Sequence, residues 1–430
     1  MRILLTLLLA AGLCHADDWP HWMGPKRDNV WRETGVLDTF PKDVLKPLWK
    51  VPVAGGYAGP AVADGRVYLA DFVSPADPKA EEYERKNTKG TERVLCFDAK
   101  TGKELWKHES ACTYTISFPN GPRCTPAVTG GKVYTLGAEG NLFCLDAATG
   151  KPVWSKDFKT DYGAKTPLWG YAGHPFIDGQ KVICIVGGDG ACVVAFDKDT
   201  GKELWKNLTA REQGYSSPAI IEEAGVRQLL VWHAESVNAL DPETGKKFWS
   251  TLLKATNGGA VMVPARDGEL LFVGGYDGVC KGYKLTTDKP GVVELWTGDR
   301  RKGIYPVNGQ PFLENGLLYG VDTKGELRCM ELATGKRLWE SLDAVGGKAG
   351  QCATAFIVKH ADRFILFNER GELIIADMDR DGYREVSRAK VIEPTGNAFG
   401  RDLVYSMPAF ADKCVFVRSD KELICVSLAK

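Results

Sequence analysis

Short apolar runs, each followed by a polar turn, recur along the whole chain. Three of them occupy positions 94–97, 142–145 and 193–196, and an acidic residue follows each one. β-Branched and aromatic side chains dominate these runs, and their short length is typical of strands. The pattern predicts an all-β chain built from antiparallel hairpins.

One phrase follows these runs repeatedly: an acidic residue, two variable residues, Thr-Gly-Lys, and a Trp three positions later. Its five copies begin at Asp98, Asp146, Asp197, Asp241 and Glu331. The Trp falls at the same offset from the acid in every copy, so chance similarity does not explain the pattern. Repeats a few tens of residues apart indicate an array of units that bury their faces only against one another.

Each part of the phrase has a physical role. The acid can cap its own turn by accepting backbone N–H groups, and Gly supplies the positive φ of a tight hairpin. The strand that follows ends on Trp, whose indole buries roughly 200 Å² and needs more cover than one small sheet provides. We therefore expect seven Trp side chains to dock between neighbouring units: Trp49, Trp106, Trp154, Trp205, Trp249, Trp296 and Trp339.

A second pattern precedes the phrase: a Pro-Ala-Val type strand and then a Val-Tyr type strand, as at 60–62 and 66–69. Each unit thus has four strands. The end of the chain supplies three strands without an outer one, and the strand at Trp49 has no unit of its own. Pairing the two ends would close a ring and remove exposed edges. The sequence predicts an eight-bladed β-propeller over residues 47–430, with four-stranded antiparallel blades, closed by pairing of the N- and C-terminal strands.

Some units depart from the repeat. Residues 286–291 replace the usual turn in the unit of Trp296, and the outer strand near 383–386 lacks a Trp. The charged, Pro-containing segment 74–92 is predicted to be a mobile surface loop inserted into the first blade, with a docking or lid segment as the alternative.

The N-terminal residues lie outside the repeats. Arg2 precedes the apolar stretch 3–13, and small residues stand near Ala16, so residues 1–16 are predicted to be a secretory signal peptide cleaved after Ala16. The stretch is too short for a membrane-spanning helix, which needs ~20 apolar residues. Residues 17–46, rich in Trp and Pro, are predicted to be an irregular lead-in that wraps the propeller. We expect the mature protein outside the cytoplasm, in the periplasm or secreted.

Charge and cysteine content exclude several partners and chemistries. Lys plus Arg number 55 and Asp plus Glu also 55, so no overall field attracts nucleic acid or an anionic membrane. Four cysteines stand in a slot where sister copies have Ala, and are expected to be small buried hydrophobes: Cys96, Cys144, Cys329 and Cys425. Cys112 and Cys124 are the best disulfide candidates. No Cys-x-x-Cys occurs, which argues against structural zinc.

With the repeat laid out, the chain resembles the PQQ-type β-propeller superfamily, in which this Asp-x-x-Thr-Gly-Lys…Trp phrase is the docking motif between blades. The resemblance covers nearly everything after about residue 47. The lead-in Trp19-Pro20-x-Trp22 and the Cys425–Leu428 ending look closer still to the secreted PQQ-binding-like propellers common in planctomycetes. The superfamily holds quinoprotein dehydrogenases and cofactor-free scaffolds, so the resemblance implies PQQ and Ca²⁺ as conceivable cofactors. This chain lacks the adjacent cysteines that many of those enzymes carry over the quinone.

Ligands of propellers meet the mouths of the central channel, where loops lead into the inner strands. Those loops carry aromatic, amide and one Arg side chain, which together suit a polar planar ligand or a peptide. The candidate ligand-binding residues are Tyr57, Arg123, Trp169, Tyr171, His174, Tyr215, Asn308, Gln310 and Gln351. The alternative is that the aromatic residues only plug the channel.

Other chemistry finds little support. Asp377, Asp379 and Asp381 precede Gly382 as at the start of a calcium loop, but the closing acid is missing, so a solvated hairpin turn is preferred to calcium. The mature histidines form no metal-binding pair, and no nucleophile or phosphate-loop motif occurs. The leading hypothesis is a monomeric ligand- or protein-binding scaffold module. The alternative is a PQQ-dependent alcohol or sugar dehydrogenase.

Overall fold

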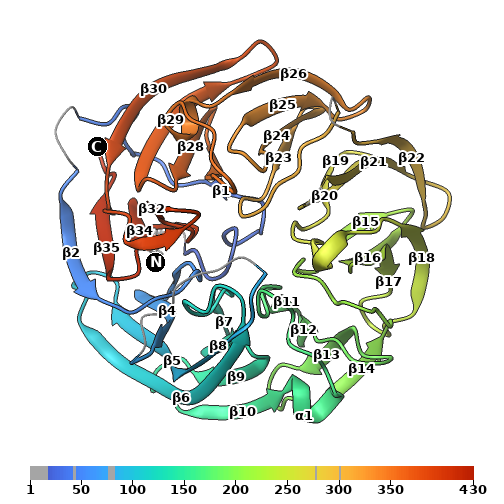
Figure 1. Ribbon diagram of the computed structural model, residues 1–430, viewed down its shortest axis with the longest axis horizontal. Coiled ribbons are helices and arrows are strands. Elements are labelled where there is room, and N and C mark those ends of the chain that lie inside the picture. Colours follow the sequence, from blue (N-terminus) through green and yellow to red (C-terminus); the bar gives the residue numbers. More distant parts are fainter. Residues whose placement is uncertain (1–17, 42–44, 76–82, 277, 300–301) are drawn as a thin grey trace, which may run out of the picture.

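The computed structural model describes residues 18–41, 45–75, 83–276, 278–299 and 302–430. The described strands form a ring of sheets around a central axis, as the sequence predicts, with each sheet a blade of a propeller (Figure 1). The proposed signal peptide, residues 1–16, lies outside the described residues.

The first three blades follow one another along the chain. Blade 1 comprises β3 (Ala61–Ala63), β4 (Arg66–Val73), β5 (Lys86–Asp98) and β6 (Glu104–Ile116). Blade 2 comprises β7 (Ala127–Thr129), β8 (Lys132–Leu136), β9 (Asn141–Asp146) and β10 (Pro152–Asp157). Blade 3 comprises β11 (Phe176–Asp178), β12 (Lys181–Ile185), β13 (Val193–Asp197) and β14 (Glu203–Asn207).

The next three blades continue the same order from inner to outer strand. Blade 4 comprises β15 (Ala219–Glu223), β16 (Val226–Trp232), β17 (Ser236–Leu240) and β18 (Lys247–Leu252). Blade 5 comprises β19 (Ala265–Asp267), β20 (Leu270–Gly275), β21 (Val279–Leu285) and β22 (Val292–Thr297). Blade 6 comprises β23 (Phe312–Glu314), β24 (Leu317–Val321), β25 (Leu327–Glu331) and β26 (Lys336–Ser341).

The last two blades each take a strand from the N-terminal part of the chain. Blade 7 comprises β27 (Ala355–His360), β28 (Arg363–Asn368), β29 (Glu372–Met378) and β30 (Tyr383–Lys390), with β1 (Val30–Trp31) parallel to β27. Blade 8 comprises β33 (Ala409–Ala411), β34 (Cys414–Arg418), β35 (Glu422–Ser427) and β2 (Pro47–Pro52). A hairpin of β31 (Gly396–Ala398) and β32 (Arg401–Leu403) lies between them. The described helices are α1 (Phe158–Tyr162), η1 (Thr256–Gly258) and η2 (Asp343–Val345).

Blade 8 joins the two ends of the chain. β2 runs antiparallel to β35, with Trp49 opposite Cys425, and the two strands lie side by side in blue and red in Figure 1. The Trp49 indole reaches on to blade 1, where its Nε1 donates to the Ala99 carbonyl at 2.9 Å. The orphan strand and the missing outer strand identified in the sequence are thus the two halves of one pairing.

The tryptophans dock between blades, as predicted. Nε1 of Trp106 in blade 1 donates to the Ala147 carbonyl of blade 2 at 3.0 Å, and an ideal Cβ on Gly150 would lie 2.4 Å from that indole. Glycine is therefore required at position 150 for two reasons: its φ is +72°, and the Trp106 ring occupies the space of a Cβ. The same indole-on-glycine contact joins Trp49 to Gly102, Trp154 to Gly201, Trp205 to Gly245, and Trp296 to Gly335.

Trp339 and Trp249 dock without a glycine. Nε1 of Trp339 donates to the Asp379 carbonyl of blade 7 at 2.8 Å. Trp249 packs toward blade 5, which carries the aberrant turn at 286–291 in place of Thr-Gly-Lys. Its Nε1 donates instead to the side-chain Oε1 of Gln228 in its own blade, at 2.8 Å. A departure in one blade therefore changes the docking of the blade before it.

The acid of each phrase caps its turn. Oδ1 of Asp98 accepts the Thr101 backbone N–H at 2.8 Å and the Thr101 hydroxyl at 2.7 Å. Asp146 and Asp197 make the same pair of bonds to Thr149 and Thr200. These hydrogen bonds, from the Thr hydroxyl first, hold the pKa of all three carboxyls below the usual value.

A β-bulge marks the docking position in every blade. In blade 1 Trp106 lies opposite Cys96, whereas the next pair is Glu104 with Phe97, so Leu105 is the extra residue. A bulge strengthens the local twist and re-aims a side chain, which turns the indole toward the neighbouring blade. In blade 7 the position of the Trp belongs to Ser387, opposite Ile375. Its hydroxyl accepts the backbone N–H of Phe40 at 2.9 Å, so the lead-in contacts the blade at this point.

The lead-in runs along the inner edges of the innermost strands, at the centre of the ring (Figure 1). Trp19 bridges to Val62 of β3, and Pro20 accepts the Val128 N–H of β7 at 2.8 Å. Arg27 then donates to the Ile177 carbonyl of β11 at 3.1 Å before β1 reaches blade 7. Apart from the short β1, the described lead-in is irregular.

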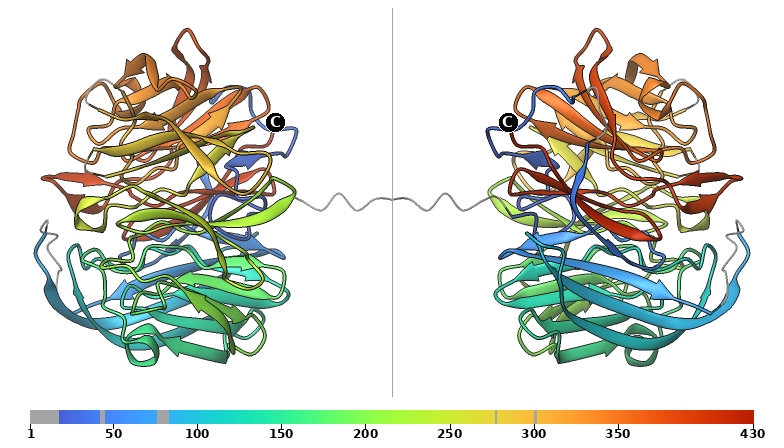
Figure 2. Two further views of the ribbon diagram at one scale, coloured as in Figure 1. Left: turned by 90° about the vertical axis from the view of Figure 1, so that its right-hand side faces the viewer. Right: turned by 90° about the vertical axis from the view of Figure 1, so that its left-hand side faces the viewer.

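Two sequence-based predictions need correction. β5 begins at Lys86 and pairs with β6 along its length, so residues 86–92 are part of a strand and not of a loop. The long hairpin, coloured blue to cyan, runs along the side of the ring in Figure 2. Cys112 and Cys124 are both free thiols, because the Cys124 sulfur instead faces the carbonyls of Tyr171 and Gly173.

The cysteines in the Ala-sized slot are buried, as expected. Cys96, Cys144 and Cys329 are fully buried, and Cys425 is 1% exposed. Burial raises the pKa of the Cys96 thiol to about 12, which suits a packing role rather than a reactive one. Among the described residues, no helix is both long and apolar enough to cross a membrane.

Candidate functional site

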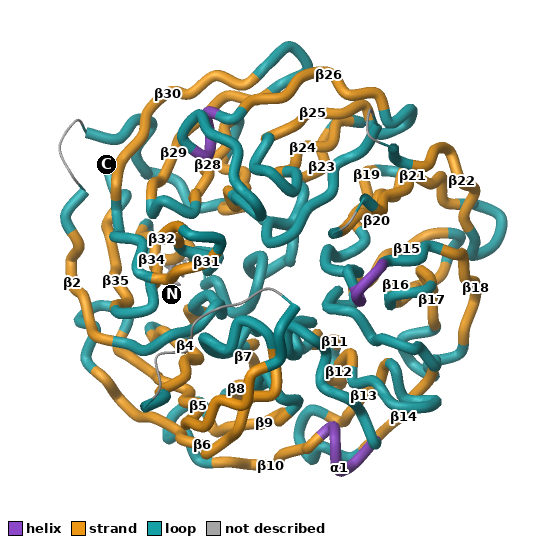
Figure 3. Tube along the Cα trace, in the orientation of Figure 1, coloured by secondary structure: helices purple, strands orange, loops and turns teal. Residues whose placement is uncertain are grey.

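Loops from all around the ring converge on the central channel together with the lead-in, and both are drawn in teal near the centre of Figure 3. They enclose a cavity of about 230 Å³. Its aromatic lining consists of Trp22, Tyr57, Phe118, Trp169, Tyr215, Tyr276, Phe356, Phe399 and Tyr405. Its polar lining includes Arg123, Thr125, His174, Ser217 and Asn308. Trp22 comes from the lead-in, which runs along the inner edges of β3 and β7.

Six of the nine candidate residues line this cavity: Tyr57, Arg123, Trp169, His174, Tyr215 and Asn308. Three do not. Tyr171 is buried and donates from its hydroxyl to the Val186 carbonyl at 2.8 Å. Gln310 is buried too, and its amide bonds both the N–H and the carbonyl of Val263. Gln351 accepts a hydrogen bond from Arg401 at its backbone carbonyl and is outside the lining.

Trp169 is the centre of an aromatic cluster. Its ring centroid lies 5.2 Å from that of Tyr215, 5.6 Å from Tyr276 and 6.0 Å from Tyr83. The hydroxyls of Tyr83 and Tyr276 are 2.8 Å apart, although they come from blades 1 and 5. Such offset and edge-on pairs fix one another in place, so this side of the mouth presents a preformed aromatic wall.

A second aromatic pair faces the cavity. Phe118 and Phe399 lie with centroids 5.6 Å apart, and both have a φ of +52°. The left-handed conformation costs a non-glycine residue roughly 1–2 kcal/mol. It persists where surroundings over-determine it, which is a feature of binding sites. Tyr276 and Phe399 were missed in the sequence because they sit in hairpin turns and not in the loops that enter the inner strands.

Among the described residues that line the cavity, Arg123 alone carries a permanent charge. Its terminal nitrogens donate to the carbonyls of Ser117 at 3.2 Å, Phe118 at 2.6 Å, and Gly121. Its guanidinium carbon lies 4.9 Å from the centroid of the Tyr57 ring, within the range of a cation–π contact. Arg123 therefore orders the loop that carries Phe118.

His174 is held as a neutral ring. It stacks on Trp22 with centroids 4.3 Å apart, and its Nδ1 accepts the Thr125 N–H at 2.9 Å. Burial, assisted by the charge of Arg27, lowers the pKa of His174 from 6.5 to about 3. The proton of the neutral ring is therefore on Nε2, and the side chain adds no charge to the cavity.

This pKa shift predicts a pH dependence of stability. The unfolded chain binds a proton at His174 below about pH 6.5, whereas the folded protein resists it down to about pH 3. The stability that neutral His174 contributes is thus complete above pH 6.5 and is lost as the pH falls, by at most about 1.4 kcal/mol per unit. His174→Asn keeps an acceptor for Thr125 without titrating there. We expect urea unfolding between pH 6.5 and 4 to show a shallower decline for this variant.

Burial also lowers the pKa of His21, to about 3. Part of the loss of stability at low pH should therefore remain in the His174→Asn variant. Identical slopes for the two proteins would contradict the assignment of His174.

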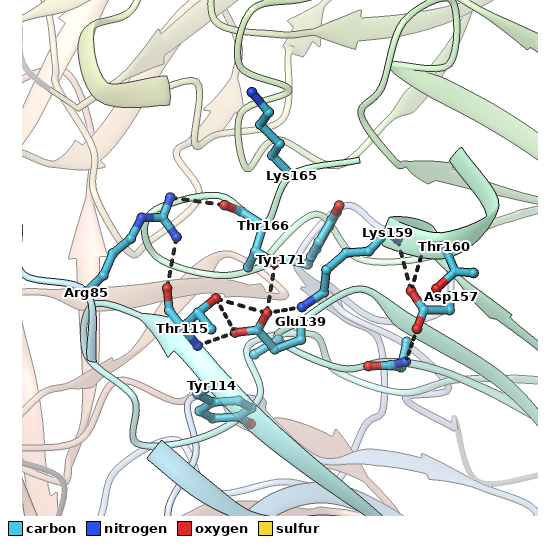
Figure 4. A network of polar contacts seen from close by, with 12 residues as sticks. Arg85, Tyr114, Thr115, Glu139, Asp157, Lys159, Thr160, Lys165, Thr166 and Tyr171 are labelled. Atoms are coloured by element: carbon cyan, nitrogen blue, oxygen red, sulfur yellow. Dashed lines mark hydrogen bonds and ion pairs between the residues drawn. The ribbon is translucent and has the colours of Figure 1, made fainter. Parts of the chain in front are cut away.

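A buried carboxylate positions the loop that carries Trp169. Glu139, 3% exposed, accepts the Thr115 N–H at 2.5 Å, the Thr166 hydroxyl at 2.8 Å and the Lys159 ammonium at 2.5 Å (Figure 4). Arg85 donates to the carbonyls of Thr115 and Thr166 at 2.9 and 3.1 Å. The end of β6 and the 164–171 loop are thereby held together, which fixes one wall of the cavity.

The sequence matches the model of a known protein family. The family described as outer membrane protein assembly factor BamB matches residues 90–280 and 233–430, which together span most of the chain. The chain belongs to this family. A search of curated proteins finds no match to it.

Solved structures share the fold of this BamB-family chain at low sequence identity. BamB from Moraxella catarrhalis is 16% identical, with a TM-score of 0.57 over 90% of this chain and 98% of that one. Quinohemoprotein alcohol dehydrogenase from Comamonas testosteroni is 14% identical, with a TM-score of 0.62 over 96% and 81%. The computationally designed Ika8 protein is 12% identical, with a TM-score of 0.52 over 87% and 98%. At these identities the likeness is one of fold.

The acidic groups of the BamB-family chain lie outside the cavity lining. Glu92 accepts the Tyr114 hydroxyl at 2.6 Å, and Asp420 accepts the Asn120 amide at 2.5 Å. Among the described residues, no group of three or more His, Cys, Asp or Glu is placed to hold a metal ion. At the suggested calcium loop, Asp379 caps its own turn and Asp377 pairs with Arg363 and Arg384.

Proposed function

We propose that the protein is an extracytoplasmic binding module, in which a rigid propeller presents one aromatic cavity to a small flat ligand or to an aromatic side chain of a partner protein. The observation that carries this proposal is the cavity itself, lined by nine aromatic residues and by no carboxylate. Convergent aromatic groups with a few polar atoms are typical of sites that bind and orient a ligand.

Two further features support binding. The lead-in contributes to the cavity, because Trp22 stacks on His174 within its lining. Its walls are ordered before any ligand arrives, by the Trp169 cluster and the Glu139 network. A preformed site loses little conformational entropy on binding. The predicted signal peptide and the family support a place outside the cytoplasm.

The alternative is a PQQ-dependent dehydrogenase. PQQ is flat and would suit the aromatic walls, but it carries three carboxylates. The lining offers these three carboxylates a single cation, Arg123. The lining also lacks a carboxylate that could accept a proton or coordinate Ca²⁺. The residues present do not fit the PQQ–Ca²⁺ pair, and the binding role is favoured.

One experiment separates the two functions. The purified mature protein is titrated with PQQ plus Ca²⁺, and in parallel with 2-naphthamide as a neutral flat probe. We expect saturable calorimetric binding of 2-naphthamide, lost in Trp169→Ala but kept in Phe248→Ala, a control on an outer strand. A rise in melting temperature together with dye-linked alcohol oxidation in PQQ and Ca²⁺ would instead establish the dehydrogenase.

A further inference from the structure

The charge of the cavity specifies its ligand more closely. The lining contains one permanent charge, on Arg123, and no Asp, Glu or Lys. His174 contributes none, because its Nδ1 accepts the Thr125 N–H. The aromatic cavity thus carries a single positive charge at its wall.

Among the described residues no carboxylate forms an ion pair with Arg123, although the buried Glu92 is near enough to interact with its charge through space. The hydrogen bonds of Arg123 go to the backbone carbonyls of 117, 118 and 121. The buried acids nearby have other donors: Glu92 takes the Tyr114 hydroxyl and the Ala138 N–H, while Asp420 takes the Gly56 N–H and the Asn120 amide. Carbonyl dipoles orient a guanidinium without supplying a counter-charge, so an anion in the cavity would be attracted to Arg123.

Arg123 also keeps donors for a ligand. A guanidinium has five N–H groups, and the three bonds to the loop come from its two terminal nitrogens. The Nε–H has no partner among these hydrogen bonds, so it can donate to one carboxylate oxygen. The face of Tyr57 beneath the guanidinium, 4.9 Å from its carbon, keeps the group next to the aromatic wall.

We propose that the cavity binds a flat, mainly apolar organic acid with a single carboxylate, which meets Arg123 while the body stacks among Tyr57, Trp169 and Tyr215. This inference rests on the proposed binding function and deepens it. One cation matches one carboxylate, and a second anionic group on the ligand would be buried among aromatic rings without a partner. A small acid fits better than a peptide chain, because the cavity has a volume of only about 230 Å³.

The test compares 2-naphthoate with 2-naphthamide, which share one ring system and differ in the charge. We expect the wild type to bind 2-naphthoate at least tenfold more tightly by calorimetry, as for a hydrogen-bonded charge pair. Arg123→Gln should remove most of this preference while still binding the amide, and Arg123→Lys should retain part of it. Arg384→Gln, an exposed arginine on β30, should behave as wild type and controls for the loss of one positive charge.

The outcomes distinguish this inference from the proposed function. Equal affinity of the wild type for the two probes, or a preference that survives in Arg123→Gln, overturns the carboxylate inference and leaves the cavity as a binding site. Binding of neither probe overturns both. Loss of all binding in Arg123→Gln is checked by its far-ultraviolet spectrum and melting temperature. With these unchanged, the residue is essential for either ligand, and a charge-specific role is refuted.

Discussion

Replacing Gly150 with Ala is expected to lower the free energy of unfolding by about 3–5 kcal/mol, a loss typical of a severe packing or backbone defect. The added Cβ would lie 2.4 Å from the Trp106 indole, and the φ of +72° is unfavourable for any residue with a Cβ. The indole is 9% exposed and bonded to the Ala147 carbonyl, so it cannot move away without giving up its hydrogen bond and its burial.

Gly65→Ala is the matched control. Gly65 has a φ of +70° in a blade 1 turn, with nothing within 4 Å of the added Cβ. The free energy of unfolding of this variant should fall only by the cost of placing a residue with a Cβ at positive φ, about 1–2 kcal/mol. Urea unfolding at equilibrium, followed by tryptophan fluorescence, measures both variants. Equal losses would show that the indole contact contributes nothing to the cost.

The repeat could be predicted because its parts lie close together in the sequence. The acid, the glycine and the Trp of one phrase span nine residues, and each has one conformation that satisfies its own chemistry. The closure of the ring was predicted from two incomplete elements: the strand at Trp49, which has no unit of its own, and the last unit, which has no outer strand. Both conclusions rest on local pattern and counting, which tertiary packing rarely overrides.

The cavity was predicted only in part, because its residues occur once and not in every repeat. Tyr57, Trp169 and Tyr215 were found since they stand in loops that lead into inner strands. Tyr276 and Phe399 reach the mouth from hairpin turns, a placement that depends on the length and φ of each turn. Tyr171 and Gln310 stand in the right loops but turn toward Val186 and Val263. A side chain's direction within a loop is set by such partners, which no spacing reveals.

The failed disulfide has a similar cause. Cys112 and Cys124 flank one segment, and sequence separation alone made them a plausible pair. The β5–β6 hairpin is longer than the repeat suggests, and it carries Cys112 opposite Gly90. Cys124 is packed instead against the 171–173 backbone. A bridge requires both position and direction, and the hairpin extension fixes both.

Replacement of Arg418 is expected to cause the second large loss of stability. Its side chain is fully buried, and it donates to the carbonyls of Ser419 at 3.0 Å, Ala70 at 3.1 Å, and Ala54. Those carbonyls belong to blade 8, to β4 of blade 1, and to the segment that follows β2. One guanidinium therefore ties together the two ends of the ring. Burial lowers the pKa of Arg418 from its ordinary value, which reflects the cost of keeping the charge there.

Arg418→Met is expected to lower the free energy of unfolding by about 3–5 kcal/mol, as when one partner is removed from a buried polar network. Met keeps much of the volume but leaves the carbonyls of Ala54 and Ala70 without their donor. Burial raises the pKa of Asp420, and that carboxyl would lose its nearest cation, 4.0 Å away.

The matched control is Arg384→Met, because the side chain of Arg384 is 77% exposed and pairs with Asp377 on the surface. Exposed pairs contribute roughly 0–1 kcal/mol, so this variant should remain near wild type. Hydrogen exchange locates the effect: in Arg418→Met the amides of β2 and β35 should exchange faster than those of blades 3 and 4, because the ring opens where its ends meet. If exchange rose evenly around the ring, Arg418 would stabilise the propeller as a whole and not its closure.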